Sequence, residues 1–176
     1  YDTDKPFSVS SLYENTYEST NPSNVTLTEK ELEIWHTGPT HETKIGNAVT
    51  LLCKTLCTLI KKAQPYCQTS TKTSTTDLVT EVDRGIEILI RIWLNKHLPD
   101  HKIIGEEYQK DTLSPDDTIW YIDPIDGTTN YTEQSLETCL LVGCIKKGEP
   151  YYAFVGLPGH DTYYYSDLSQ TVYRDG

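Results

Sequence analysis

Apolar residues recur every three or four positions in two stretches of the chain. In the first stretch, residues 44–65, they are Ile45, Ala48, Val49, Leu52, Leu56, Leu59 and Ile60. In the second, residues 80–97, they are Val82, Ile86, Leu89, Ile90, Trp93 and Leu94. This spacing is that of a helix with one apolar face. The pattern therefore predicts two amphipathic helices, ended near Pro65 and Pro99.

Short apolar runs separated by turn residues replace this pattern after residue 101. They predict strands at 102–104, 119–122, 140–145, 151–155, 163–165 and 171–173. The runs 140–145 and 151–155, with the turn residues between them, have the form of a hairpin. Because the helices come first and the strands cluster later, we expect an α+β fold with an antiparallel sheet.

Residues 1–40 show neither the helical spacing of apolar residues nor the short apolar runs of the strands. They are rich in Ser, Thr, Asn and Pro and poor in aliphatic residues, which is typical of a poorly ordered extension. With 176 residues in all, we expect this extension to precede one folded domain at 41–176. The chain begins at Tyr1 and contains no methionine, so we interpret it as a processed chain or a fragment.

The charge balance is strongly acidic, with 26 acidic residues against 15 basic ones and a formal net charge of −11. Such a balance disfavours binding to nucleic acid and to anionic membranes. The longest apolar run, 139–145, is too short to span a bilayer, and no signal-peptide pattern opens the chain. We expect neither nucleic acid nor membrane as a partner.

The chain has five cysteines, an odd number, and no Cys-x-x-Cys pair. This favours a reducing compartment, so the expected location is cytoplasmic. Cys53 and Cys57 lie one helical turn apart, but no third ligand joins them at a metal-binding spacing, so we expect them in the core. His97 and His101 have the spacing of a metal pair. Pro99 breaks the helix between them, which favours two solvated histidines.

Acidic residues fall at the ends of three predicted elements. Asp83 lies at the start of the second helix, Glu106 and Glu107 follow the first strand, and Asp123 and Asp126 follow the second. Mg²⁺ prefers oxygen ligands of this kind. Carboxylates gathered without a cation would repel each other, so the pattern indicates bound metal or raised pKa values.

Residues 123–130 also supply what a phosphate group needs. Pro124 stiffens the step between the two acids, and Gly127 lets an anion approach the backbone. The N–H groups of Gly127 and Thr128 would point outward if a helix begins there, and the Thr128 hydroxyl can orient a water molecule. The alternative is that these residues have only a structural role. Asp-Gly is a common turn pair, and an acidic pair such as Glu106–Glu107 usually marks a solvated surface.

Three blocks, in order, resemble the motifs of the inositol monophosphatase family of magnesium-dependent, lithium-sensitive phosphatases. They are KTSTTDLVTEVD at 72–83, IGEE at 104–107 and DPIDGTTN at 123–130. The resemblance covers residues 44–176, the family's N-terminal part. It implies the first half of a layered α/β/α/β/α sandwich, a small phosphorylated substrate and a homodimer.

The resemblance also implies a cofactor of two or three Mg²⁺ ions and a metal-binding role for each matching residue. Glu106, Asp123 and the Ile125 carbonyl group would bind a first ion, and Asp123 with Asp126 a second. Glu107, or a water near Glu106, would complete a third and weaker site.

The remaining roles implied by the resemblance concern water and phosphate. Glu106 with Thr128 would activate the attacking water, Asp83 would pair with the Thr128 hydroxyl, and Lys72 would lie near the metals. The backbone N–H groups of Gly127 and Thr128 would hold the phosphate. The implied reaction is in-line attack of water on a phosphate monoester, without a phosphoenzyme.

Two departures from the family pattern leave the substrate open. The family's second motif, a Trp-Asp pair that supplies a further ligand, is missing before Gly176, so the isolated chain is expected to expose apolar surface and to bind metal poorly. After Asn130 the chain reads YTEQSLE, where the family tends to have an aromatic residue, His and Pro.

The first hypothesis is hydrolysis of inositol monophosphate or a related sugar phosphate. The alternatives are a 3′(2′),5′-bisphosphate nucleotidase, a fructose-1,6-bisphosphatase, or a catalytically incomplete relative that binds metal or phosphate.

Overall fold

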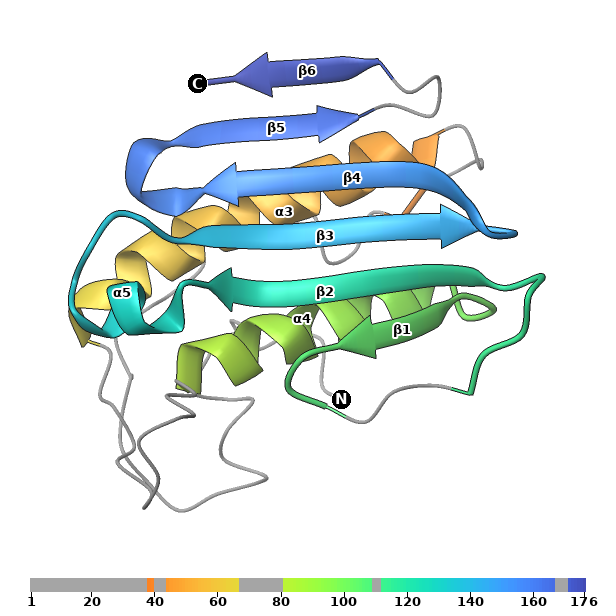
Figure 1. Cartoon of the computed structure of the whole chain (residues 1–176), viewed down its shortest axis with the longest axis horizontal. Coiled ribbons are helices and arrows are strands. Elements are labelled where there is room, and N and C mark those ends of the chain that lie inside the picture. Colours follow the sequence, from red (N-terminus) through yellow and green to blue (C-terminus); the bar gives the residue numbers. More distant parts are fainter. Residues whose placement is uncertain (1–37, 40–43, 67–80, 109–111, 167–170) are drawn as a thin grey trace.

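The structure, a computed structural model, describes residues 38–39, 44–66, 81–108, 112–166 and 171–176. Lys72 and nearly all of the predicted extension lie outside these ranges, so the division at residue 40 stays a prediction. Within the described residues, two long helices lie on one face of a six-stranded sheet (Figure 1). The α+β prediction is confirmed.

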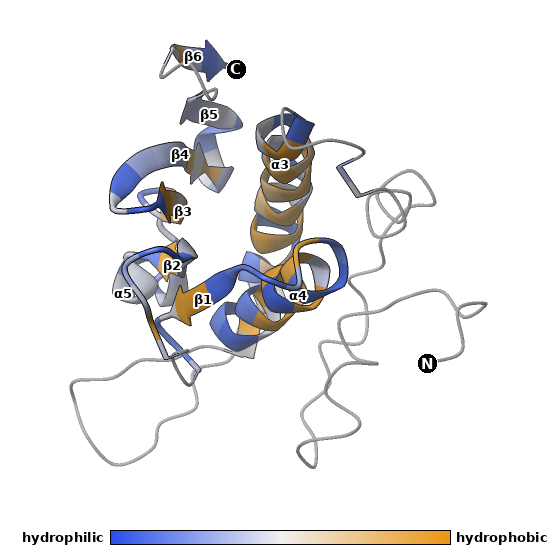
Figure 2. Ribbon diagram, turned by 90° about the vertical axis from the view of Figure 1, so that its right-hand side faces the viewer, coloured by the Kyte–Doolittle hydropathy of each residue, from blue (hydrophilic) through white to orange (hydrophobic). Residues whose placement is uncertain are grey.

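Both long helices form where the apolar spacing predicts them. Helix α3 spans Ile45–Ala63, two residues short of Pro65, and helix α4 spans Glu81–His97. A short 3₁₀ turn, η2 (Gln64–Tyr66), follows α3. Figure 2 shows the two helices side by side, on the same side of the sheet.

The six strands follow one another across the sheet in chain order. They are β1 (Lys102–Gly105), β2 (Thr118–Asp126), β3 (Cys139–Lys146), β4 (Glu149–Leu157), β5 (Thr162–Ser166) and β6 (Val172–Asp175). All neighbours are antiparallel except β1 and β2, which run parallel. The prediction of an antiparallel sheet therefore holds for β2 to β6 but not for β1, because a run of apolar residues does not specify the direction of its partner strand.

Two short elements complete the described fold. Helix α5 (Thr128–Thr132) follows β2 directly, and the 3₁₀ turn η3 (Pro158–His160) joins β4 to β5. The predicted hairpin is β3–β4, and its two turn residues, Lys147 and Gly148, have φ values of 52° and 81°. Two positive φ values in a two-residue loop match the twist of antiparallel strands.

The core lies between the helices and the inner face of the sheet. Its largest fully buried side chains include Trp93 from α4, Trp120 from β2 and Phe154 from β4. Cys53 and Cys57 are buried among them, at 0% and 1% exposure, so the prediction of core packing is confirmed. Burial raises the pKa of both thiols, which keeps them protonated.

The prediction of two solvated histidines is wrong. Both are partly buried, because the turn at Pro99 returns the chain toward the aromatic core. The His97 ring packs 4.8 Å from that of Trp93, and His101 Nδ1 accepts a 2.9 Å hydrogen bond from Trp120 Nε1.

The second face of the sheet carries apolar side chains but, among the described elements, no helix. Tyr121 and Tyr164 are 39% and 38% exposed. A shallow hollow of about 550 Å³ lies on this face, lined by Ile104, Tyr121, Leu141 and Val155 beside Glu106 and Asp123. The expected exposure of apolar surface is seen here.

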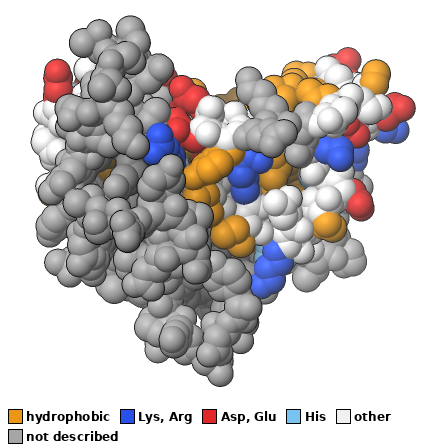
Figure 3. Space-filling view, turned by 90° about the horizontal axis from the view of Figure 1, so that it is seen from below, with side chains coloured by type: hydrophobic (Ala, Val, Ile, Leu, Met, Phe, Trp, Pro, Cys, Tyr) orange, Lys and Arg blue, Asp and Glu red, His pale blue; other side chains and the backbone are white. Residues whose placement is uncertain are grey.

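Apolar and charged side chains alternate on the surface seen from below. Apolar side chains lie among Lys and Arg side chains there, and acidic side chains lie in the upper and outer parts of the view (Figure 3). No helix within the described residues combines the length and the apolarity that a membrane crossing requires.

Candidate active site

The parallel pairing of β1 and β2 brings two of the acidic clusters together. Gly105 pairs with Ile122 in the register of the two strands, and the Glu106 N–H donates a 3.2 Å hydrogen bond to the Ile122 carbonyl group. Glu106 therefore follows β1 at the level of Asp123 in β2. Because parallel strands end at the same edge of a sheet, the two carboxylates share that edge.

Asp123 has the most perturbed carboxyl group of the site. Burial, then the charge and hydrogen bonding of Glu106, then the charges of Asp126 and Asp83, raise its pKa from 3.8 to about 7. Its Oδ1 atom is buried and has no hydrogen-bond partner. A buried acceptor without a donor is costly, and a hard cation would satisfy it.

Asp126 lies within β2 rather than after it. A register shift between Asp123 and Asp126 sets the two acids on an irregular end of the strand, with Pro124 and Ile125 buried between them. The prediction that this strand ends at residue 122 is therefore wrong. It rests on the poor strand-forming tendency of a proline and two acids.

Gly127 makes the turn from β2 into α5. Its φ of 86° lies in the left-handed region, and a Cβ atom added there would come within 3.0 Å of the Glu137 carbonyl oxygen. The Thr128 hydroxyl donates a 3.0 Å hydrogen bond to the carbonyl group of Ile125. This hydroxyl therefore contacts the carbonyl expected to bind metal, and its pairing with Asp83 stays a prediction.

Glu107 is held by α4 through a residue that sequence reasoning missed. The Glu107 N–H donates a 2.7 Å hydrogen bond to the side chain of Glu87. That side chain is 0% exposed, and it also accepts a 2.7 Å hydrogen bond from Arg91 Nε. The Glu107 carboxylate lies 3.7 Å from Arg84 Nε. The sequence did offer one signal: Glu87 is an acid on the apolar face of the helix, four residues after Asp83.

Cys139 is a second neighbour that the sequence did not indicate. Its Sγ donates a 3.6 Å hydrogen bond to Asp126 Oδ2 across the β2–β3 pair. Burial, followed by the charge and hydrogen bonding of Asp126, raises the pKa of this thiol to about 11. The thiol is therefore protonated and stabilises the Asp126 carboxylate as a hydrogen-bond donor.

Glu106, Asp126 and Asp83, in that order of effect, lie near enough to Asp123 for their charges to raise its pKa. No three Asp, Glu, His or Cys side chains in the described ranges form a ready metal-binding group. The donor atoms nevertheless fit Mg²⁺ in type, since all are oxygens, and the buried Asp123 Oδ1 has no hydrogen-bond donor that a cation would have to displace.

A sequence profile of the Inositol monophosphatase family matches residues 41–176. Inositol-1-monophosphatase of Bacillus subtilis (strain 168) is 33% identical over 106 residues, which are 60% of this chain and 40% of that protein. The fructose-1,6-bisphosphatase/inositol-1-monophosphatase of Aquifex aeolicus (strain VF5) is 35% identical over 100 residues, 57% of this chain and 38% of that protein.

The fold is similar to that of solved members of this group. A crystal structure of an IMPase/NADP phosphatase complexed with Mg²⁺ and phosphate superposes with a TM-score of 0.68 and 26% identity, over 76% of this chain and 51% of that one. The chain spans about half of that structure and less than half of the two curated relatives. Because the family profile covers most of its length, the chain belongs to the inositol monophosphatase family.

Proposed function

We propose that this chain carries metal-binding and water-activating residues of a Mg²⁺-dependent phosphomonoesterase that hydrolyses inositol monophosphate or a related sugar phosphate. One observation carries the proposal. Asp123 has a buried oxygen without a donor, and the charges of Glu106, Asp126 and Asp83 act on the same carboxyl group. Such a set is unfavourable by itself and favourable around a divalent cation.

Each residue then has a distinct task. Glu106, Asp123, Asp126 and the Ile125 carbonyl group would hold the cations, with Glu107 at a weaker position. Bound Mg²⁺ supplies charge neutralisation of the phosphate and a lower pKa for the attacking water.

The water and the phosphate are handled by neighbouring groups. Thr128 and Glu106 would orient the attacking water, and Glu106 would accept its proton. The backbone N–H groups of Gly127 and Thr128 would bind phosphate oxygens, and Asp83 and Lys72 would support Thr128 and the metal ligands. A homodimer and a cytoplasmic location remain part of the proposal.

A panel of phosphate-release assays on the full-length protein identifies the substrate. Phosphate release with Mg²⁺ is measured from inositol 1-phosphate, fructose 1,6-bisphosphate and 3′-phosphoadenosine 5′-phosphate. The Aquifex relative bears both an inositol-phosphatase and a fructose-bisphosphatase name, which is why fructose 1,6-bisphosphate is in the panel.

Asp126→Asn should reduce phosphate release to below about 5% of wild type, because it removes one charge from the cation site. Asp116→Asn is the matched control, since Asp116 is an exposed acid outside the site, and it should keep full activity. Wild-type turnover by Asp126→Asn would refute the metal assignment. No release from any substrate by the wild type would refute the phosphatase.

A further inference from the structure

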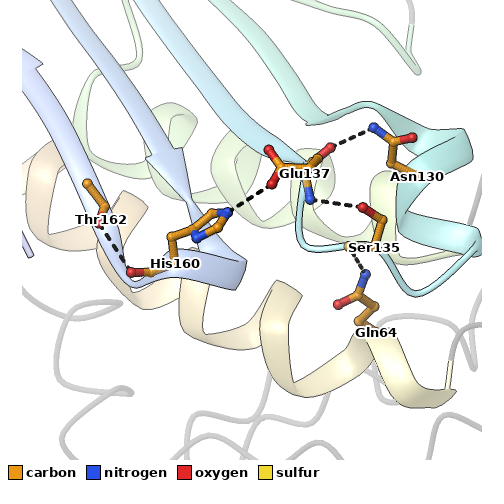
Figure 4. Close-up of polar contacts among 6 residues, drawn as sticks. All are labelled: Gln64, Asn130, Ser135, Glu137, His160 and Thr162. Atoms are coloured by element: carbon orange, nitrogen blue, oxygen red, sulfur yellow. Dashed lines mark hydrogen bonds and ion pairs between the residues drawn. The ribbon is translucent and has the colours of Figure 1, made fainter.

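A buried glutamine joins the end of α3 to the segment that follows β2. Gln64 is the residue after α3 and is 9% exposed. Its Nε2 donates a 2.7 Å hydrogen bond to the Ser135 carbonyl group (Figure 4). It also donates a 3.3 Å hydrogen bond to the Tyr131 carbonyl group. A buried amide is retained only where it is well bonded, and both of these acceptors belong to α5 or to the loop after it.

Two more hydrogen bonds cross the same junction. The Tyr131 hydroxyl donates to the Ile60 carbonyl group at 2.8 Å, and Gln134 Nε2 donates to the Gln64 carbonyl group at 2.9 Å. The Ile60 carbonyl group also accepts the Gln64 backbone N–H, so the Tyr131 hydroxyl is its second donor. The Gln64 carbonyl group, just past the end of α3, accepts its hydrogen bond from the segment that follows the candidate site.

The far side of this loop contacts the turn at Gly127. The Glu137 N–H donates to Ser135 Oγ at 3.2 Å, and Asn130 Nδ2 donates to the Glu137 carbonyl group at 2.8 Å, as Figure 4 shows. That same carbonyl oxygen is the atom a Cβ on Gly127 would meet at 3.0 Å. Hydrogen bonds therefore connect Gln64 through Ser135 and Glu137 to Asn130 in α5. A shorter route runs through Tyr131, whose carbonyl group accepts from Gln64 and whose N–H donates to the Gly127 carbonyl group at 3.0 Å.

We propose that Gln64 is a positioning residue of the active site. It fixes α5 and the loop 133–137 against α3, and so fixes the turn that carries Asp126 and Thr128 relative to Glu106 and Asp123. This inference rests on the proposed function. Gln64 does not touch the reacting atoms, and its effect comes through the placement of groups that do.

The test uses two variants of Gln64 in the full-length protein. Gln64→Leu removes both hydrogen bonds, and Gln64→Glu keeps the shape but turns a carboxylate oxygen toward two carbonyl oxygens. We expect kcat to fall about tenfold or more in each, because a 1 Å displacement in an active site can cost about a hundredfold. KM should change less, and the Mg²⁺ concentration for half-maximal activity should rise.

The matched control is Thr55→Val. Thr55 is buried in the same helix, and its hydroxyl donates a 3.1 Å hydrogen bond to Leu51 within that helix. Thr55→Val should lower thermal stability but leave kcat and the Mg²⁺ dependence at wild-type values. All kcat measurements are made well below the melting temperature of each variant. If neither Gln64 variant folds, Tyr131→Phe, which loses the bond to Ile60, is judged by the same criteria.

The outcomes separate the two proposals. Wild-type kcat and Mg²⁺ dependence in the folded variants would overturn the role of Gln64 and leave the phosphatase intact. An equal loss of kcat in Thr55→Val would also overturn it, since the effect would then be general. No Mg²⁺-dependent phosphate release by the wild type would overturn the phosphatase and, with it, this role.

Discussion

At the scale of single residues, Asp123 should contribute to the pH dependence of the metal-free protein's stability. Its pKa in the folded state, about 7, lies above its ordinary value of 3.8. The folded state therefore binds more protons between these pH values than the unfolded state. Its free energy of unfolding should fall as pH rises from about 4 to about 7.

The Asp123→Asn variant tests this prediction. In EDTA at pH 8 it should unfold with a free energy about 1–2 kcal/mol above wild type, a modest value because the carboxyl group is only partly screened from solvent. Urea denaturation at pH 5 and pH 8 measures both proteins. An identical pH slope in Asp123→Asn and wild type would show that other groups set the dependence.

Glu87 is the residue on which the placement of Glu107 depends. In Glu87→Gln, one of the two buried acceptor oxygens becomes an N–H₂ group that faces another donor. The free energy of unfolding should fall by about 2–4 kcal/mol, measured by urea denaturation. Glu137→Gln is the control, because the Glu137 side chain is 76% exposed and its contact with His160 is a surface pair. The free energy of unfolding of Glu137→Gln should fall by less than about 1 kcal/mol.

At the scale of elements, the three- to four-residue apolar spacing predicted both long helices closely, because each is long enough to show that spacing. Short apolar runs predicted where each strand lies. The direction of β1, the end of β2 and the partners of Glu87 and Gln64 could not be predicted in this way. They depend on pairs of residues that are far apart in the sequence, and a local pattern does not contain them. The acids of the site were found because they lie inside short motifs.

The turn between β2 and α5 offers a prediction at this scale. Gly127→Ala should lower the free energy of unfolding by about 2–3 kcal/mol, since it combines an unfavourable positive φ with a tight contact to Glu137. Gly148→Ala is the control: Gly148 has a φ of 81° but open space around its Cα. It should lose only about 1 kcal/mol. Equal losses in thermal or urea unfolding would show that the contact with Glu137 has no energetic weight.

At the scale of the whole molecule, the sheet has one face packed by helices and another with apolar side chains at its surface. The 176-residue chain by itself should bind a hydrophobic dye on the second face. Tyr121→Lys and Leu141→Lys should each reduce the dye fluorescence by about half or more. Val172→Lys, a change at the edge strand β6, is the control and should reduce it little. Unchanged fluorescence in all three variants would place the dye elsewhere.

The strand order has a consequence for the way this chain folds. Each strand pairs with its neighbour in sequence, so most of the sheet can grow by closing short loops, beginning with the two-residue turn between β3 and β4. Short loops cost little entropy and form quickly. The connections on either side of β2, residues 106–117 and 127–138, are longer, and so is the closure that docks α4 onto β2. The edge that carries the carboxylates is therefore expected to assemble late, on a sheet whose other strands are already joined.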